Sequence, residues 1–112
     1  MSSYNLESVQ EMAGGDQEFV KVVVQTFLEE IPSDLLAMNE AIAGDNAGMA
    51  YQYAHKMKPN FLMFGLMLLP EIKIIEDWSK SGKDKKEVEE AALTINTTVN
   101  KAISELATDF DL

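Results

Sequence analysis

The chain has 112 residues, 46% of them hydrophobic, with no cysteine and a formal charge of −10 from 19 acidic and 9 basic residues. This length suits a single domain, residues 1–112, with one apolar core, and the lack of cysteine excludes disulfides and thiolate metal sites. Nucleic acid is a poor partner for so acidic a chain, because phosphate contacts need clustered cations.

The sequence shows no signal for secretion or for a membrane. Its N-terminus lacks a cationic segment followed by an apolar one. The longest apolar stretch, residues 61–69, is far shorter than the ~20 residues that a spanning helix needs. We therefore expect a cytoplasmic protein with no membrane partner, and a monomer as its simplest state.

The first predicted helix is short. Asn5 can cap it, and the glycine pair at positions 14 and 15 can end it. Its apolar residues share one face: Leu6, Val9 and Met12.

A long helical segment follows, from Asp16 as its cap to Ala43. Its apolar residues recur at the i, i+3, i+4, i+7 spacing of a core-facing stripe. They are Val20, Val23, Val24, Phe27, Leu28, Ile31, Leu35, Met38 and Ile42. Because the stripe stays in phase across Pro32, we expect one kinked helix or two nearly coaxial ones.

Three further helices complete the chain. Gly44 ends the long segment, and Asp45 can cap a helix over residues 46–64, so the connection predicts a tight antiparallel turn.

Pro70 suits the first turn of the next helix, which ends at Gly82, with Ile72, Ile75 and Trp78 facing inward. In the last helix the residues with near-heptad spacing are Val88, Ala92, Ile95, Val99, Ile103 and Leu106, after a capping pair at Asp84 and Glu87. The expected fold is all-α, an antiparallel four-helix bundle with a short additional N-terminal helix.

The only histidine, His55, lies in the third of these predicted helices. At about 100° per residue, one side of that helix gathers Ala50, Ala54, Met57, Phe61 and Phe64. His55 lies about 150° from them and is therefore expected to face water. The exposed strip around it consists of Gly48, Tyr51, Gln52, Lys58, Pro59 and Leu62.

The run Ala54-His55-x-x-Lys58, with Gly65 ten residues after the histidine, resembles the phosphoacceptor helix of histidine-containing phosphotransfer (HPt) domains. The resemblance implies a four-helix bundle that accepts a phosphoryl group on His55 and exchanges it with the aspartate of a receiver domain. It also implies that Lys58 steadies the phosphorylated state and that Gly65 permits close helix packing. The partners would be a response-regulator receiver, with Mg²⁺ bound to the receiver, or a hybrid sensor histidine kinase.

This chain departs from the family pattern directly after the lysine. Family members usually have glycine there and small residues at the next two positions, whereas this chain has Pro59, Asn60 and Phe61. Pro59 has no N–H to bond the carbonyl of His55, so we expect the helix to kink or loosen just below the acceptor. Transfer rate and partner choice are the properties that this change would affect.

Docking of the receiver is predicted on the exposed strip together with Met63. Leu62 is two turns beyond His55 and only about 20° away around the helix, so whatever exposes the histidine also exposes this leucine. With Tyr51, Pro59 and Met63 it makes a small apolar patch beside the acceptor.

Other readings of the same residues stay open. His55 is also compatible with an ordinary surface histidine, and Lys58 with a solubilising charge. A helical adaptor could bind a receiver through the same face without being phosphorylated, and a haem-binding bundle could use His55 and a methionine. Zinc is disfavoured because the exposed strip contains no carboxylate. The chain also lacks a glycine-rich nucleotide loop, so it should not phosphorylate itself. We therefore expect a phosphoryl carrier without a cofactor rather than an enzyme.

Overall fold

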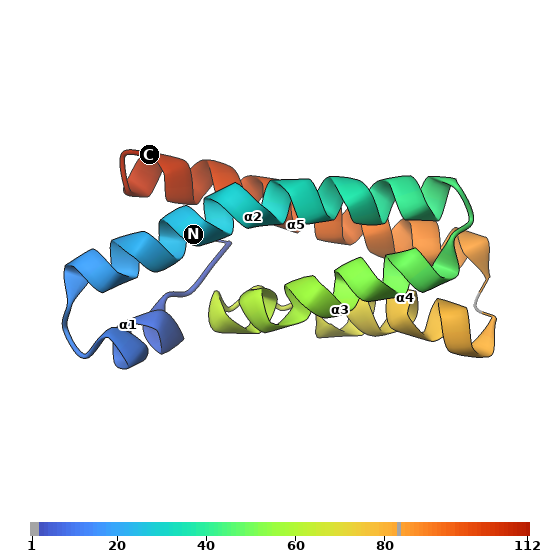
Figure 1. Ribbon diagram of the computed structural model, residues 1–112, viewed down its shortest axis with the longest axis horizontal. Coiled ribbons are helices and arrows are strands. Elements are labelled where there is room, and N and C mark those ends of the chain that lie inside the picture. Colours follow the sequence, from blue (N-terminus) through green and yellow to red (C-terminus); the bar gives the residue numbers. More distant parts are fainter. Residues whose placement is uncertain (1–2, 83) are drawn as a thin grey trace.

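A computed structural model describes residues 3–82 and 84–112 of the chain, and within them every regular element is a helix (Figure 1). The elements are α1 (Glu7–Ala13), α2 (Gln17–Ala43), α3 (Ala47–Met63), α4 (Leu69–Ser81) and α5 (Lys85–Asp109). The predicted all-α class is confirmed.

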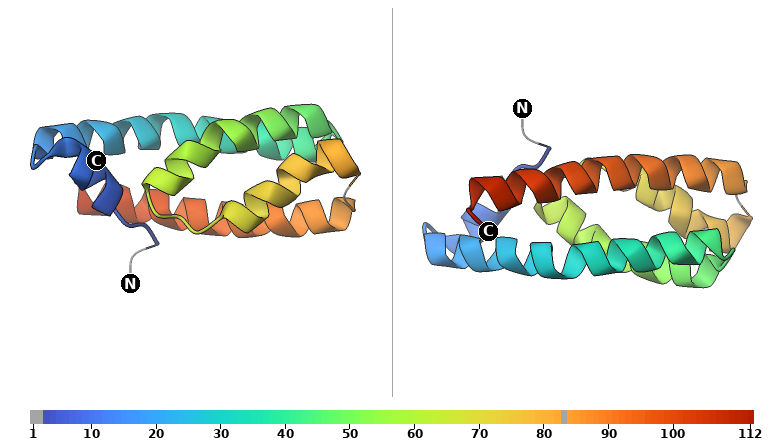
Figure 2. Two further views of the ribbon diagram at one scale, coloured as in Figure 1. Left: turned by 90° about the horizontal axis from the view of Figure 1, so that it is seen from below. Right: turned by 90° about the horizontal axis from the view of Figure 1, so that it is seen from above.

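The four longer helices form an antiparallel bundle, and the molecule measures 45 × 23 × 22 Å. Each helix from α2 to α4 packs against the next one along the chain, and α2 also packs against α5, which closes the bundle. Figure 2 shows that α2 and α5 each extend over most of the length of the bundle, and Figure 1 shows that they cross at an angle. The short helix α1 packs against α2 at the end of the bundle opposite the α2–α3 turn (Figure 1).

The core contains the apolar stripes that the helical spacing predicts. Phe27 of α2 stacks against Phe64, with ring centroids 4.2 Å apart and an interplanar angle of 34°. In α5 the stripe is buried except for Ile103, which is half-buried. The prediction that Met12 shares the buried apolar face of Val9 is wrong. Met12 is 59% exposed, whereas Val9 on the same short helix is fully buried. Packing of α1 against the bundle covers Val9 but leaves Met12 in solvent.

Polar side chains cap the N-termini of α2, α3 and α5. Asp16 accepts hydrogen bonds from the backbone N–H groups of Glu18 and Phe19, as predicted. The cap of α3 is Asn46, which accepts from the N–H of Met49, and not the predicted Asp45. Asp45 instead has φ +58° and forms the left-handed part of the turn, which leaves the capping position to the following residue.

Both interior prolines lie within continuous helices. Of the two alternatives at Pro32, a single helix is observed, since α2 runs from Gln17 to Ala43. Helix α3 likewise continues through Pro59 as far as Met63. The backbone hydrogen bond that Pro59 cannot donate is therefore missing without ending the helix. The residues after Pro59 keep their positions around the helix axis.

Candidate functional site

His55 lies on the outer face of α3, as the helical spacing predicts. The neighbouring Ala54 and Met57 are fully buried against the core, whereas the His55 side chain is 62% exposed. The imidazole is therefore accessible to a second macromolecule while its backbone is fixed by a packed helix.

Glu76 of α4 holds one nitrogen of the imidazole. Its Oε2 lies 3.0 Å from Nδ1 of His55, and its side chain is only 12% exposed. An ionised carboxylate can accept hydrogen bonds but cannot donate them, so the contact with Glu76 in that form assigns the proton to Nδ1, which donates it to Glu76. In the neutral imidazole Nε2 then keeps its lone pair, and it has no partner among the residues that the structure describes.

Lys58 approaches the same carboxylate from the next turn of α3. Its Nζ lies 3.6 Å from Oε1 of Glu76, and its side chain is 37% exposed. One carboxylate of α4 thus binds two groups of α3, His55 through one oxygen and Lys58 through the other. The lysine ammonium compensates the negative charge that burial makes costly, and it lies close to the imidazole.

Tyr51 covers one side of the imidazole. Its ring lies one turn before His55, with centroids 5.5 Å apart and planes within 6° of parallel. Lys80 of α4 places its Nζ 4.9 Å from the centroid of the tyrosine ring, so a second cation lies near the site. The stack and the Glu76 hydrogen bond restrict rotation of the imidazole from two directions.

Comparisons with family models, curated proteins and solved structures found no match. Function must therefore be argued from these side chains and from the motif that carries them.

Within residues 3–82 and 84–112, no three metal-binding side chains come together. No described helix combines the length and the apolar character that crossing a membrane requires.

The remaining residues of the predicted strip lie on the surface. Gly48, Gln52 and Pro59 are exposed, and Leu62 has 52% of its surface exposed. Met63 is half-buried and packs against the core. The rotation assigned to α3 from its sequence is therefore correct from Gly48 to Leu62, whereas Met63, predicted on the docking patch, is partly covered by the core.

Gly65 does not have the predicted role in helix packing. It lies in the loop after α3 with φ +66°, and a Cβ on it would come within 2.7 Å of the Cβ of Asn5. The segment before α1 crosses the loop at this point, where the N–H of Asn5 donates to the carbonyl of Phe64 at 2.7 Å. The lack of a side chain is needed here for contact with an extended segment, and the positive φ favours glycine independently.

Lys56 belongs to a separate contact. Its Nζ lies 3.0 Å from Oδ1 of Asp34, a buried residue of α2. The hydrogen bond and charge of Asp34 raise the pKa of Lys56. The ion pair links α3 to α2 and points away from the Glu76 side of the helix.

The two acidic residues that sequence reasoning missed share a recognisable position. Asp34 falls within the apolar stripe of α2, three residues after Ile31, and Glu76 falls within that of α4, four residues after Ile72. A carboxylate at a core-facing position must find a cation or a donor on a neighbouring helix. That signal was present in the sequence, although it does not say which neighbour supplies the partner.

Proposed function

We propose that this chain is a phosphoryl carrier of a two-component phosphorelay, with His55 as the acceptor and the aspartate of a receiver domain as its exchange partner. The observation that supports it most directly is the contact between His55 Nδ1 and the buried Glu76. It leaves an exposed imidazole with its second nitrogen free, which is what a nucleophilic histidine needs. The Ala-His-x-x-Lys motif supplies the link to phosphotransfer.

The reaction follows from the protonation state of the ring. The lone pair of Nε2 attacks the phosphorus of an aspartyl phosphate, the P–N bond forms, and the P–O bond to the aspartate breaks. The aspartate leaves as a carboxylate. The imidazole gains positive charge as the new bond forms, and the Glu76 carboxylate next to Nδ1–H stabilises that charge. The reverse transfer uses the same groups.

Lys58 would act on the phosphorylated form. Its ammonium is paired with Glu76 at 3.6 Å, which is longer than a strong charge-assisted hydrogen bond. A phosphoryl group on Nε2 brings oxygens with more negative charge into the same region. The lysine side chain is long enough to turn toward these oxygens, and it would thereby lengthen the lifetime of the phosphohistidine.

The partner would provide the remaining chemistry. This chain holds no nucleotide-binding loop, so the phosphoryl group would come from a separate donor and not from ATP bound to this chain. The Mg²⁺ that assists transfer would be bound by the receiver. The contribution of this chain is a positioned imidazole and a surface for docking.

Mass spectrometry of the intact protein tests the proposal. The purified chain is incubated with phosphoramidate, a small phosphoryl donor, and separately with each phosphorylated receiver domain of the source genome. We expect the mass of one phosphoryl group, labile in acid and stable in alkali, on His55 and not in the matched variant His55→Gln. If no donor phosphorylates His55, the carrier function is wrong and a non-catalytic adaptor becomes the better explanation.

A further inference from the structure

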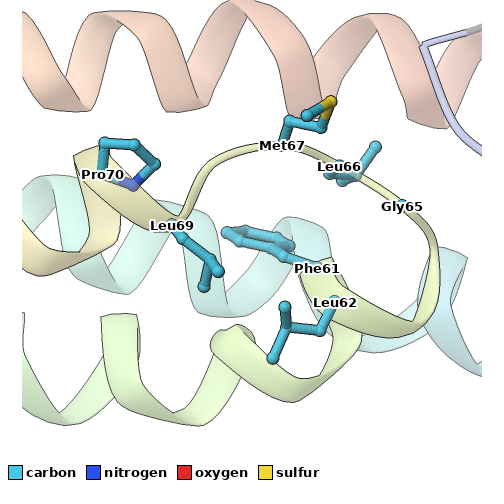
Figure 3. A pocket seen from close by; sticks show the side chains of 7 residues that line it. All are labelled: Phe61, Leu62, Gly65, Leu66, Met67, Leu69 and Pro70. Carbon is cyan, nitrogen blue, oxygen red and sulfur yellow. The ribbon is translucent and has the colours of Figure 1, made fainter.

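An apolar pocket of about 460 Å³ lies at the C-terminal end of the exposed strip around His55, here called the His55 face. It is bordered by the last turn of α3, the loop over residues 64–68 and the first turn of α4 (Figure 3). The residues that line it are Phe61, Leu62, Gly65, Leu66, Met67, Leu69 and Pro70.

The pocket leaves apolar side chains uncovered. Met67 is 91% exposed, and Leu62 and Leu69 are each about half exposed at its rim, while Phe61 and Leu66 are buried beneath them. None of the lining residues is charged, in a chain with a net charge of −10. A contiguous apolar surface of this kind marks a place where another molecule binds.

Backbone hydrogen bonds hold the loop that forms the pocket. The N–H of Leu66 donates to the carbonyl of Phe61 at 2.9 Å, and the N–H of Gly65 donates to that of Leu62 at 3.2 Å. The contact of Asn5 with Phe64 fixes the loop from the other side. The pocket is therefore formed before any partner arrives, and filling it costs little ordering of the chain.

The position of the pocket connects it to the phosphoacceptor. Leu62 lines the pocket and also belongs to the His55 face, seven residues and about 10 Å along α3 from the histidine. A protein interface of ordinary size covers about 800 Å² on each partner, equal to a disc of about 16 Å radius. A protein that brings an aspartyl phosphate to Nε2 of His55 would therefore also cover the pocket.

The charges around the pocket indicate what kind of surface would dock. Helix α3 contains two lysines and no acidic residue. Residues 47–82 hold four lysines and three acidic residues, a net charge of +1, whereas the rest of the chain carries −11. Because Lys56 is paired with Asp34 of α2, this region is close to neutral, and an acidic partner surface would meet less repulsion here than elsewhere on this protein.

From these observations we infer that the pocket anchors the protein that exchanges phosphoryl groups with His55, and that it takes an apolar side chain from an otherwise acidic surface of that partner. This inference rests on the proposed phosphotransfer function. The anchor supplies desolvated apolar contact within the interface, while His55 and Lys58 meet the acidic reacting centre.

Neutral, nearly isosteric substitutions test the anchor without adding charge. Met67→Gln and Leu69→Asn are combined, and Leu93→Asn is the control, since Leu93 is 67% exposed on α5 and lines a different surface with Asn39 of α2. We expect transfer from the phosphorylated receiver, at concentrations below saturation, to fall by about ten-fold in the pocket variant and to stay unchanged in the control. Phosphorylation by phosphoramidate, which needs no docking, should be equal in all three proteins.

Each outcome is decisive. Equal receiver transfer in the pocket variant and the wild type overturns the anchor and leaves the phosphotransfer function intact. Failure of the wild type to accept phosphate from either donor overturns both. A second measurement follows the Met67 methyl signal by NMR in the His55→Gln protein. The signal should shift when the receiver is added, and a shift that depends only on the concentration of this chain would assign the pocket to a second copy instead.

Discussion

Removal of the Glu76 carboxylate gives the sharpest test of how this site is built. In Glu76→Ala, Nδ1 of His55 loses its acceptor at 3.0 Å and Lys58 loses its partner. Without that acceptor the proton redistributes between the two ring nitrogens, so a smaller fraction of the molecules presents a free lone pair at Nε2. The positive charge that develops on the ring is also no longer stabilised.

The size of the expected rate loss in Glu76→Ala follows from the exposure of the His55 and Glu76 side chains. A hydrogen bond to a charged group contributes ~1.5–3 kcal/mol. Because the His55 side chain is 62% exposed, solvent screening lowers the expected contribution to ~1 kcal/mol. Transfer should then slow by about five- to ten-fold. The free energy of unfolding should change by ~1 kcal/mol or less, because the desolvation cost of the carboxylate is removed with its contacts.

Glu76→Gln is the matched control. The amide oxygen can still accept from Nδ1–H, so the tautomer is kept while the charge is lost, and the transfer rate should fall between those of the wild type and Glu76→Ala. The rate is measured with phosphoramidate and with a receiver, and the tautomer by nitrogen chemical shifts of the ring. Wild-type rates together with unchanged ring shifts in Glu76→Ala would refute the role assigned to this carboxylate.

Four further outcomes are expected. Lys58→Ala should shorten the lifetime of the phosphorylated protein without preventing receiver binding, since an exposed charge contact worth on the order of 1 kcal/mol is lost; an unchanged half-life would make Lys58 a surface charge. Pro59→Ala restores an N–H within a continuous helix and should raise the melting temperature, and a lower one would show that the chain needs the ring. Leu62→Asp should reduce receiver transfer by ten-fold or more for each ~1.4 kcal/mol of binding lost, with little loss of stability at a residue that is 52% exposed; unfolding would contradict the exposure of this face. Burial and the hydrogen bond to Asp109 raise the pKa of Tyr4 to about 12, so its contribution to stability should be complete below pH ~10 and lost as the pH rises toward 12. The difference between the ultraviolet titrations of wild type and Tyr4→Phe should show this ionisation, and a step near pH 10 would contradict it.

The rotation of each helix could be read from the sequence because one turn takes 3.6 residues. Buried positions such as Ala54 and Met57 place His55 and Leu62 on the opposite side whatever the helix packs against. The same argument predicted the stripes of α2 and α5 and hence the all-α class. It needs only local spacing, so the interior prolines did not disturb it.

The partners of the site residues required the tertiary structure. His55 and Glu76 are 21 positions apart and Lys56 and Asp34 are 22 apart, on different helices in both cases. A repeat of apolar residues shows which side of a helix is inside, but not how far one helix is shifted along its neighbour, and a shift of one turn would replace Glu76 by another side chain. Gly65 was assigned to helix packing for the same reason, because nothing local shows that Asn5 crosses the loop there. The sequence by itself therefore determined which side of α3 faces solvent, whereas the axial register of packed helices decided which carboxylate lies beside the histidine.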